Sequence, residues 1–259
     1  MNLELQDKVF IVTGGAKGIG GAVSTVLAGE GAVPVIFDLD KDAALGLKAS
    51  LESRGQRCHV YTGDLTDHTF CDRAIEEAGR LLGRIDGIVN NAGINDGAGL
   101  ESEVDRFVRS LHVNLIHYFS IVHHALPWLK KSKGAVVNIA SKIAMTGQGG
   151  TSGYAASKGA QLALTREWAA ELLPHGIRVN AVLPAEVMTP MYRQWLDTFE
   201  EPEQKLNSIV RNIPLERRMT SPEEIADTVL FLLSPRSAHT TGQWLVVDGG
   251  YVHLDRSLT

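Results

Sequence analysis

Seven short apolar runs, rich in β-branched residues, alternate along the chain with longer segments of helical periodicity. The runs predict strands at 9–13, 33–38, 58–62, 87–90, 135–140, 178–183 and 244–247. Strands separated by helices can pair in parallel, because the helix carries the chain back to the starting edge of the sheet. The alternation therefore predicts βαβ units on one parallel sheet.

The segments between the strands supply the expected helices. They begin near Gly18, Lys41, Asp67, Ser102, Ser152 and Ser221. The last start, Ser221-Pro222-Glu223-Glu224, has a proline at the first helical position and acids after it. Helices between seven strands predict an α/β fold, a Rossmann-like doubly wound sheet of about seven parallel strands with helices on both faces.

One connection in this scheme is unusually long. No linker, repeat or low-complexity tract divides the 259 residues, so we expect a single domain over 1–259. The segment 189–214, between the sixth strand and the last helix, is rich in aromatic and charged residues and is too long for an ordinary loop. We interpret it as a helical substrate lid.

Composition argues against several classes of protein. The chain is 44% hydrophobic and 21% charged with a formal net charge of −5, which is typical of a soluble globular protein and argues against nucleic acid as a partner. The first residues lack the basic and apolar regions of a signal peptide, and no apolar run approaches the roughly 18 residues of a membrane span. We expect a cytoplasmic protein that does not associate with a membrane.

Neither the cysteines nor the histidines suggest a metal site. Cys58 and Cys71 form no CxxC pair and have no metal-ligand spacing, so we expect free thiols. His117 and His124 are seven residues apart, which is not the i, i+4 spacing of a helical zinc motif. The sequence therefore predicts no catalytic metal.

A glycine-rich turn follows the first predicted strand. Gly14, Gly18 and Gly20 have the spacing GxxxGxG and open the first predicted helix. Glycines at such a turn let the backbone approach a pyrophosphate while the helix amides face it. We interpret the turn as a dinucleotide site; the alternative is a tight strand-to-helix turn that binds nothing.

An acidic residue ends the second predicted strand. Asp38 lies at about the distance from the glycines where a carboxylate accepts hydrogen bonds from an adenosine ribose. The same charge would repel a 2′-phosphate, although a cation such as Lys41 can soften this preference. We therefore predict NAD as the cofactor, with NADP possible.

A tyrosine and a lysine lie one helical turn apart in the fifth predicted helix, which begins near Ser152. Residues four apart share a helix face, so Lys158 can approach the phenol oxygen of Tyr154. A neighbouring ammonium lowers the pKa of a phenol from its usual value of about 10. The pair predicts a general base beside a bound dinucleotide; the alternative is a core aromatic beside a solvated lysine.

Several motifs occur in one order along nearly the whole chain: Thr13 to Gly20, Asp64-Leu65, Asn90 to Gly93, Asn114, Ser141, Tyr154 and Lys158. In these motifs the sequence resembles the short-chain dehydrogenases/reductases. The resemblance implies that Asp64 and Leu65 contact adenine and that Thr189 reaches the nicotinamide amide. The expected cofactor-binding residues are Gly14, Lys17, Gly18, Ile19, Gly20, Asp38, Asp64, Leu65, Asn91, Ala92, Gly93, Tyr154, Lys158, Pro184, Val187 and Thr189.

The same resemblance implies four catalytic residues. Ser141 holds the substrate oxygen and Tyr154 acts as acid and base, while Lys158 binds the nicotinamide ribose and Asn114 belongs to a water relay that reaches Lys158. The chemistry agrees, because a carbinol loses a hydride only as its hydroxyl proton leaves, so one group must accept the proton while another steadies the oxygen. The resemblance also implies a homotetramer.

The segments after the fourth, fifth and sixth strands should line the substrate crevice. Their amides, acids and large aromatics suit a sugar, with its hydroxyls and apolar ring face, better than a steroid or a long acyl chain. Asp96 can equally contact the substrate or only the rim. We predict substrate contacts at Asn95, Ser141, Gln148, Tyr154, Glu186, Tyr192 and Trp195.

Within the family, the motifs at 90–96, 114–118, 146–149, 184–190 and 249–256 look like those of bacterial L-fucose dehydrogenases. This resemblance implies oxidation of C1 of L-fucose, and of related sugars such as L-galactose and D-arabinose, to a lactone. Ala185 departs from the glycine common in the wider family at this position. The alternatives are a dehydrogenase of another secondary alcohol, such as a hydroxysteroid or a deoxy-sugar acid, and a dinucleotide-binding regulator without turnover.

Overall fold

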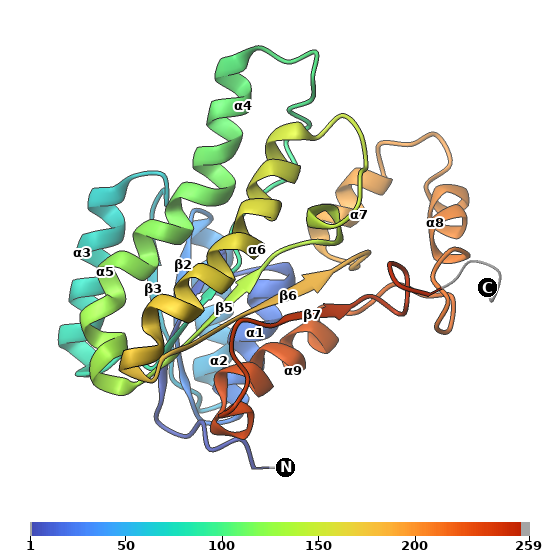
Figure 1. Ribbon diagram of the computed structural model, residues 1–259. Helices are drawn as coiled ribbons and strands as arrows, with labels where there is room; N and C mark the ends of the chain where they lie inside the picture. The colour runs from blue at the N-terminus through green and yellow to red at the C-terminus, as the bar shows by residue number, and fades with distance from the viewer. Residues whose placement is uncertain (1, 255–259) are drawn as a thin grey trace.

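The computed structural model describes residues 2–254 and contains a seven-stranded sheet with helices on both faces (Figure 1). All strand pairs are parallel, in the order β3-β2-β1-β4-β5-β6-β7. The predicted fold is confirmed, and strand ends differ from the expected ones by at most one residue. The strands are β1 (Val9–Thr13), β2 (Val33–Asp38), β3 (His59–Thr62), β4 (Gly87–Asn90), β5 (Ala135–Ile139), β6 (Arg178–Pro184) and β7 (Trp244–Val247).

Most of the helices form a layer on each face of the sheet, and the two short helices α7 (Pro190–Leu196) and α8 (Pro202–Val210) lie beyond it. The others are α1 (Gly18–Gly29), α2 (Lys41–Ser53), α3 (His68–Leu82), α4 (Val104–Leu111), α5 (His117–Ser132), α6 (Ser152–Leu172) and α9 (Pro222–Leu233). In β1, Ile11 packs toward α3 and α5, whereas Phe10 and Val12 pack toward α1 and α9. Because strand side chains alternate between the faces, a strand covered on both sides is apolar nearly throughout.

The helical stretch predicted from Ser102 is not one regular helix. Its first element, α4, begins at Val104 and leads through a π-helical turn at His112–Ile116 directly into α5. Such π-turns occur frequently at functional sites. This one contains Asn114, which is completely buried.

Two short helices, α7 and α8, occupy most of the segment that the sequence suggests is a lid. Thr189 is the N-cap of α7, and its hydroxyl accepts a hydrogen bond from the amide of Tyr192 at 3.2 Å. After α8 the chain is tied to the C-terminal segment, because the amide of Leu215 donates to the carbonyl of Gly249 at 2.9 Å. Figure 1 shows α7, α8 and the C-terminal segment on the same side of the molecule.

Residues 2–254 contain no helix with the length and apolar character needed to cross a bilayer. Both cysteines are buried and free. Over the same range, no three or more histidine, cysteine or acidic side chains are grouped so that they could hold a metal ion. Asp255 and Arg256, at the end of the C-terminal motif, lie outside the described residues.

Candidate active site

The carboxyl ends of the parallel strands bring the predicted site residues to one edge of the sheet. The glycine turn follows β1, Asp38 ends β2, Asn91 follows β4 and Ser141 follows β5. The chain runs from β1 through β2 to β3 on one side and resumes with β4 on the other, so the topology switches at β1. Doubly wound sheets bind ligands in the crevice outside such a switch point.

The glycine turn depends on close backbone contacts. Gly14 and Gly18 have φ angles of 58° and 54°, in the left-handed region that favours glycine. A Cβ on Gly20 would overlap the carbonyl oxygen of Gly14 and lie 2.6 Å from Nδ2 of Asn91. That amide nitrogen donates to the carbonyls of Thr13 and Gly14 at 2.9 and 3.1 Å. Asn91 therefore fixes the shape of the turn.

The N-terminus of α1 faces out of this turn. Its N-cap residue, Lys17, makes no side-chain capping hydrogen bond, so the first amides of the helix are not capped by that residue. Uncapped amides at a helix start, reached over glycines, are suited to a pyrophosphate. The side chain of Thr189 lies against Gly18, since a Cβ there would be 3.3 Å from Cγ2 of Thr189. The loop after β6 therefore borders the same site.

Two acids lie on the adenosine side. The carboxylate of Asp38 accepts hydrogen bonds from the amides of Ala16 and Asp40, each at 2.9 Å, and this holds it beside the glycine turn. Asp64 is exposed and accepts from the amide and the hydroxyl of Thr66 at 2.8 Å. Both positions suit polar recognition of a nucleoside, and the glycine turn suits its phosphates.

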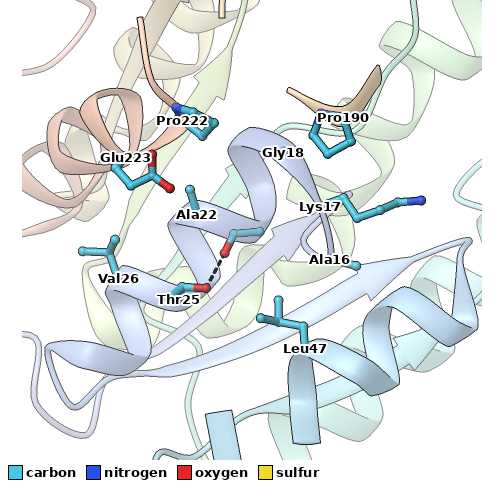
Figure 2. A pocket seen from close by; sticks show the side chains of 11 residues that line it. Ala16, Lys17, Gly18, Ala22, Thr25, Val26, Leu47, Pro190, Pro222 and Glu223 are labelled. Carbon is cyan, nitrogen blue, oxygen red and sulfur yellow. Dashed lines mark hydrogen bonds between the residues drawn. The ribbon is translucent and has the colours of Figure 1, made fainter. Parts of the chain in front are cut away.

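A hollow of about 300 Å³ lies along the outer side of α1, beside the glycine turn (Figure 2). Ala16, Lys17 and Gly18 form one end, Leu47 lies along α2, and Pro190 begins α7 above it. Pro222 and Glu223 of α9 border the other side. The hollow adjoins the cofactor side of the molecule, and Tyr154 does not line it.

Ser141 and Tyr154 meet on the other side of the switch point. Ser141 is 8% exposed and caps a 3₁₀ turn at Lys142–Ala144, where its hydroxyl accepts from the amide of Ile143 at 3.3 Å. Its hydroxyl also interacts with the phenol of Tyr154, in the first turn of α6. Two hydroxyl groups are thus brought together, one able to steady an alcohol oxygen and one able to exchange its proton.

Lys158 is buried beneath this pair, with an exposed fraction of 3%. Its Nζ donates to the carbonyl of Ile139 at 2.7 Å and lies 5.4 Å from the ring centroid of Tyr154. The predicted pairing of Tyr154 and Lys158 on one helix face is therefore present. The ammonium group lies alongside the ring, while the phenol group interacts with Ser141.

Asn114 joins the site through its backbone and its side chain. Its Oδ1 accepts from the amide of Ile94 at 2.8 Å, and its Nδ2 donates to the carbonyl of Ser110 at 3.0 Å. Its own carbonyl accepts from Nε2 of Gln161 in α6 at 2.7 Å. The π-turn thereby connects the loop after β4 with the helix that carries Tyr154.

Glu186 is already paired within the protein. Its Oε1 forms an ion pair with Lys142, and its Oε2 accepts from the hydroxyl of Tyr192 at 2.6 Å. The side chains of Lys142 and Glu186 are each 13% exposed. The ammonium group of Lys142 also lies 4.2 Å from the ring centroid of Tyr251. We call these four residues the polar wall.

The other predicted substrate residues are more open to solvent. Tyr192 packs edge-to-face on Trp195 at 5.2 Å between centroids, and Trp195 is 43% exposed. Asn95 and Gln148 are exposed on the loops after β4 and β5. Asp96 accepts hydrogen bonds from the hydroxyl of Ser110 at 3.1 Å and from the amide of Ala98 at 3.3 Å. It therefore contributes to the shape of its own loop.

Comparison with known proteins decides the family. Residues 14–252 match the family model described as enoyl-(acyl carrier protein) reductase. The 3-oxoacyl-[acyl-carrier-protein] reductase FabG of Thermotoga maritima is 35% identical, over 96% of this chain and 100% of that protein. This chain is a short-chain dehydrogenase/reductase.

Two further similarities fall within this family. The L-fucose dehydrogenase of Mus musculus is 35% identical, over 94% of this chain and 88% of that protein. The crystal structure of Cj0485 dehydrogenase matches with a TM-score of 0.95 and 44% identity, over 100% of this chain and 99% of that one. The chain is thus an oxidoreductase of a family that uses NAD(P) and acts on CH–OH groups.

The prediction that Lys158 lowers the pKa of Tyr154 is wrong. Burial raises the pKa of Tyr154 to about 12, and the hydrogen bond with Ser141 only partly offsets the rise. Burial also lowers the pKa of Lys158 to about 7, because it penalises the ammonium form. The i, i+4 spacing correctly predicts the proximity of the two side chains, but desolvation is the main cause of both pKa shifts.

Sequence reasoning assigns no role to Lys142 and Tyr251, although both lie in or beside the motifs that carry the resemblance. Lys142 directly follows Ser141, and Tyr251 follows two glycines with positive φ angles at 249 and 250. Their meeting depends on the course of the chain after β5 and β7. A charged residue directly after Ser141 is the one local signal that could have suggested the contact.

Proposed function

We propose that this protein oxidises C1 of a monosaccharide, with L-fucose as the main substrate and L-galactose and D-arabinose as further ones, to the sugar lactone with reduction of NAD. The observation that carries the proposal is the polar wall. Lys142 is the neighbour of Ser141 in sequence, so the wall begins where the substrate oxygen would be held. A substrate bound there would meet both hydrogen-bonding groups and aromatic rings.

The charges of the polar wall favour a neutral polyol. The ion pair between Lys142 and Glu186 balances one positive charge with one negative charge. A wall without net charge has little preference for a substrate acid. Its ammonium and carboxylate groups keep donor and acceptor capacity beyond their own pairing, which hydroxyls would use and a long acyl chain would not. The rings of Tyr192, Trp195 and Tyr251 offer apolar surfaces that suit the face of a pyranose.

Sequence identity alone does not choose the substrate. The mouse L-fucose dehydrogenase and the reductase FabG of T. maritima are each 35% identical to this chain. Since fold and family host many substrates, the choice must come from the site. The polar wall is the feature that favours the sugar.

The reaction assigns a task to each catalytic side chain. Tyr154 takes the proton of the C1 hydroxyl while Ser141 holds the oxygen, and the hydride leaves C1 at the same time. NAD, when bound, supplies the acceptor for that hydride. The C1 carbonyl that remains, together with the ring oxygen, is the lactone. Lys158 and Asn114 pass the proton outward, and Gln148 and Glu186 bind other ring hydroxyls.

The acid at the end of β2 favours NAD over NADP. Its carboxylate lies beside the glycine turn, where the amide of Ala16 holds it. This carboxylate suits a ribose diol and would repel a 2′-phosphate. The cation nearest in sequence to the turn, Lys17, is paired with Asp40 at 2.6 Å, so its charge is partly balanced.

We further propose that α7 and α8 act as a lid and that the protein is a cytoplasmic homotetramer. Tyr192 connects α7 to Glu186, so movement of α7 would open the polar wall. Val104 and Val108 of α4 and Phe119 of α5 are 74%, 43% and 55% exposed. Apolar side chains so exposed are suited to contact with another copy of the chain.

The test is a substrate panel with purified protein. NADH or NADPH formation is followed with L-fucose, L-galactose, D-arabinose, D-glucose and a hydroxysteroid, with NAD and NADP in separate series. Strong turnover of L-fucose with NAD is the expected result. Activity with the steroid and with no sugar would overturn the substrate proposal and leave the family assignment intact. No turnover of any alcohol would favour a dinucleotide-binding regulator. The presence of Ser141, Tyr154 and Lys158 together argues against that outcome.

A further inference from the structure

A second tyrosine lies close to the Lys158 ammonium group. Tyr118 is 0% exposed and belongs to the first turn of α5, directly after the π-turn. The Nζ of Lys158 lies 5.6 Å from its ring centroid and 5.4 Å from that of Tyr154. The ammonium group therefore lies near two phenol rings that come from different helices.

Three polar groups converge at this position. Lys158 donates to the carbonyl of Ile139 at 2.7 Å and to the hydroxyl oxygen of Tyr118 at 3.5 Å. The hydroxyl of Tyr118 in turn donates to the same carbonyl at 3.2 Å. A buried ammonium group needs acceptors to replace water. Tyr118 supplies one of them, and the end of β5 supplies the other.

Tyr118 also connects Lys158 to Asn114 through protein groups. The Gln161 side chain interacts with the hydroxyl of Tyr118, and its Nε2 donates to the carbonyl of Asn114 at 2.7 Å. Gln161 is completely buried, and its Oε1 has no hydrogen-bond partner among the described residues. The four residues Asn114, Gln161, Tyr118 and Lys158 form a buried polar connection between the π-turn and the catalytic pair.

We propose that Tyr118 is a positioning residue for the oxidation, and that its hydroxyl oxygen holds the Lys158 ammonium group in place beside Tyr154. The inference rests on the proposed dehydrogenase function and deepens it. The hydroxyl of Tyr118 contacts Lys158 and the carbonyl of Ile139, so we assign it a role that acts through Lys158. The titratable groups around Lys158 are Tyr118 and His117 from α5 and Tyr154 from α6.

The main test compares Tyr118→Phe with the matched variant Tyr61→Phe. Tyr61 packs at the border of the same core cluster, so its substitution removes a phenol oxygen without touching the site. In Tyr118→Phe the ammonium group loses an acceptor, so its charged form becomes less favourable and the nearby phenolate is less well stabilised. The acidic limb of the kcat/KM profile should therefore move to higher pH by about one unit, equivalent to about a tenfold loss at a pH on that limb. Tyr61→Phe should leave the profile unchanged.

A second measurement does not depend on turnover. A double-mutant cycle compares the stability loss from Tyr118→Phe in the native background and in Lys158→Met, by denaturant unfolding of the cofactor-free protein. If Tyr118 holds the ammonium group, the loss should fall to about half or less once that group is gone. An equal loss in both backgrounds, with an unshifted pH profile, would show that Tyr118 only fills the core and would overturn the proposal.

The two measurements also separate this inference from the substrate proposal. If the protein oxidises another alcohol but no sugar, the pH profile is recorded with that alcohol, and the positioning role of Tyr118 is judged by the same criteria. If no alcohol is turned over, the proposed function fails, and the double-mutant cycle alone decides whether Tyr118 and Lys158 are coupled.

Discussion

The cofactor side and the substrate side of this crevice are built in different ways. On the cofactor side the backbone determines the shape: Gly20 leaves room for the carbonyl of Gly14, and Asn91 bonds to backbone carbonyls. On the substrate side the polar wall consists of side chains that meet from separate segments, with Lys142 and Glu186 44 residues apart. The backbone contacts of the cofactor side permit few substitutions. The side chains of the polar wall can be replaced one at a time.

If the polar wall binds the substrate as proposed, this difference explains why one side is typical of a family and the other of a substrate. A turn that needs glycine at fixed positions keeps its spacing whatever the enzyme oxidises, because the dinucleotide does not change. The side chains of such a wall can be replaced without altering the sheet. Enzymes that share a fold can therefore act on different substrates. Variants directed at each side should therefore fail in different ways.

The largest expected effect comes from the residue between the two sides. Tyr154→Phe removes the group that exchanges the proton and leaves both walls in place, so kcat should fall by about 10²- to 10⁴-fold. NADH binding, measured by fluorescence titration, should change little. Tyr61→Phe provides the control for loss of a phenol oxygen. Turnover close to that of the native protein would contradict the assigned mechanism.

The next largest effect is expected from a substitution in the glycine turn, on the cofactor side. A Cβ at Gly20 would overlap the Gly14 carbonyl, so Gly20→Ala should cost about 2–3 kcal/mol of unfolding free energy and weaken NADH binding at least about tenfold. Gly46, inside α2, has open space where a Cβ would lie: apart from its chain neighbours and the nearby backbone of α2, no heavy atom of the described residues lies within 4 Å of that point. Gly46→Ala should instead stabilise the protein by about 0.5–1 kcal/mol. Denaturant unfolding of both variants checks the contrast.

The same contrast separates what the sequence could predict from what it could not. The strands and the glycine turn follow from short stretches of sequence, since apolar runs and the GxxxGxG spacing are local. The π-turn at Asn114 has no local pattern of its own, and the sequence there predicts ordinary helix. The meeting of Lys142 with Glu186 depends on two loops whose paths are set by the folded chain.

Burial is the other quantity that spacing does not give. The spacing of Tyr154 and Lys158 predicts a pair in which the ammonium lowers the phenol pKa. In the fold they are packed under α5 and β5, and desolvation raises the phenol pKa and lowers the lysine pKa. An i, i+4 pattern places two side chains on one face of a helix and gives no information about the depth of that face.

Lys158 is therefore expected to reduce stability at neutral and lower pH. Its folded pKa of about 7 lies below the ordinary 10.5, so the unfolded chain binds more protons between these values and stability rises with pH across that window. Lys158→Met should stabilise the protein by roughly 1–2 kcal/mol at pH about 6. The gain should shrink as the pH rises towards about 10. Unfolding curves at several pH values test this, and a gain independent of pH would contradict it.

Substitutions on the substrate side should have smaller effects. Glu186→Gln keeps the size of the side chain but removes the charge that balances Lys142, so the sugar KM should rise about tenfold, equivalent to ~1.4 kcal/mol, while the NAD KM stays nearly constant. Lys142→Met should have an effect of the same kind, and the double variant should be less than additive because the two residues are partners. Equal effects on both KM values would remove Glu186 from the substrate site.

The smallest expected effect concerns Asp38, the side chain on the cofactor side that we propose favours NAD over NADP. Asp38→Ser removes the charge that opposes a 2′-phosphate, so the ratio of kcat/KM for NADP to that for NAD should rise, but by less than about tenfold, since exposed charges contribute about 1 kcal/mol or less. Lys17 cannot freely help a phosphate while it is paired with Asp40. Adding Asp40→Ser should free its charge and raise the ratio further, whereas Asp40→Ser alone should change it least, because Asp38 still repels the phosphate. If Asp40→Ser alone gave the larger change, the preference would lie with the lysine, and the acid at the end of β2 would serve mainly to hold the turn.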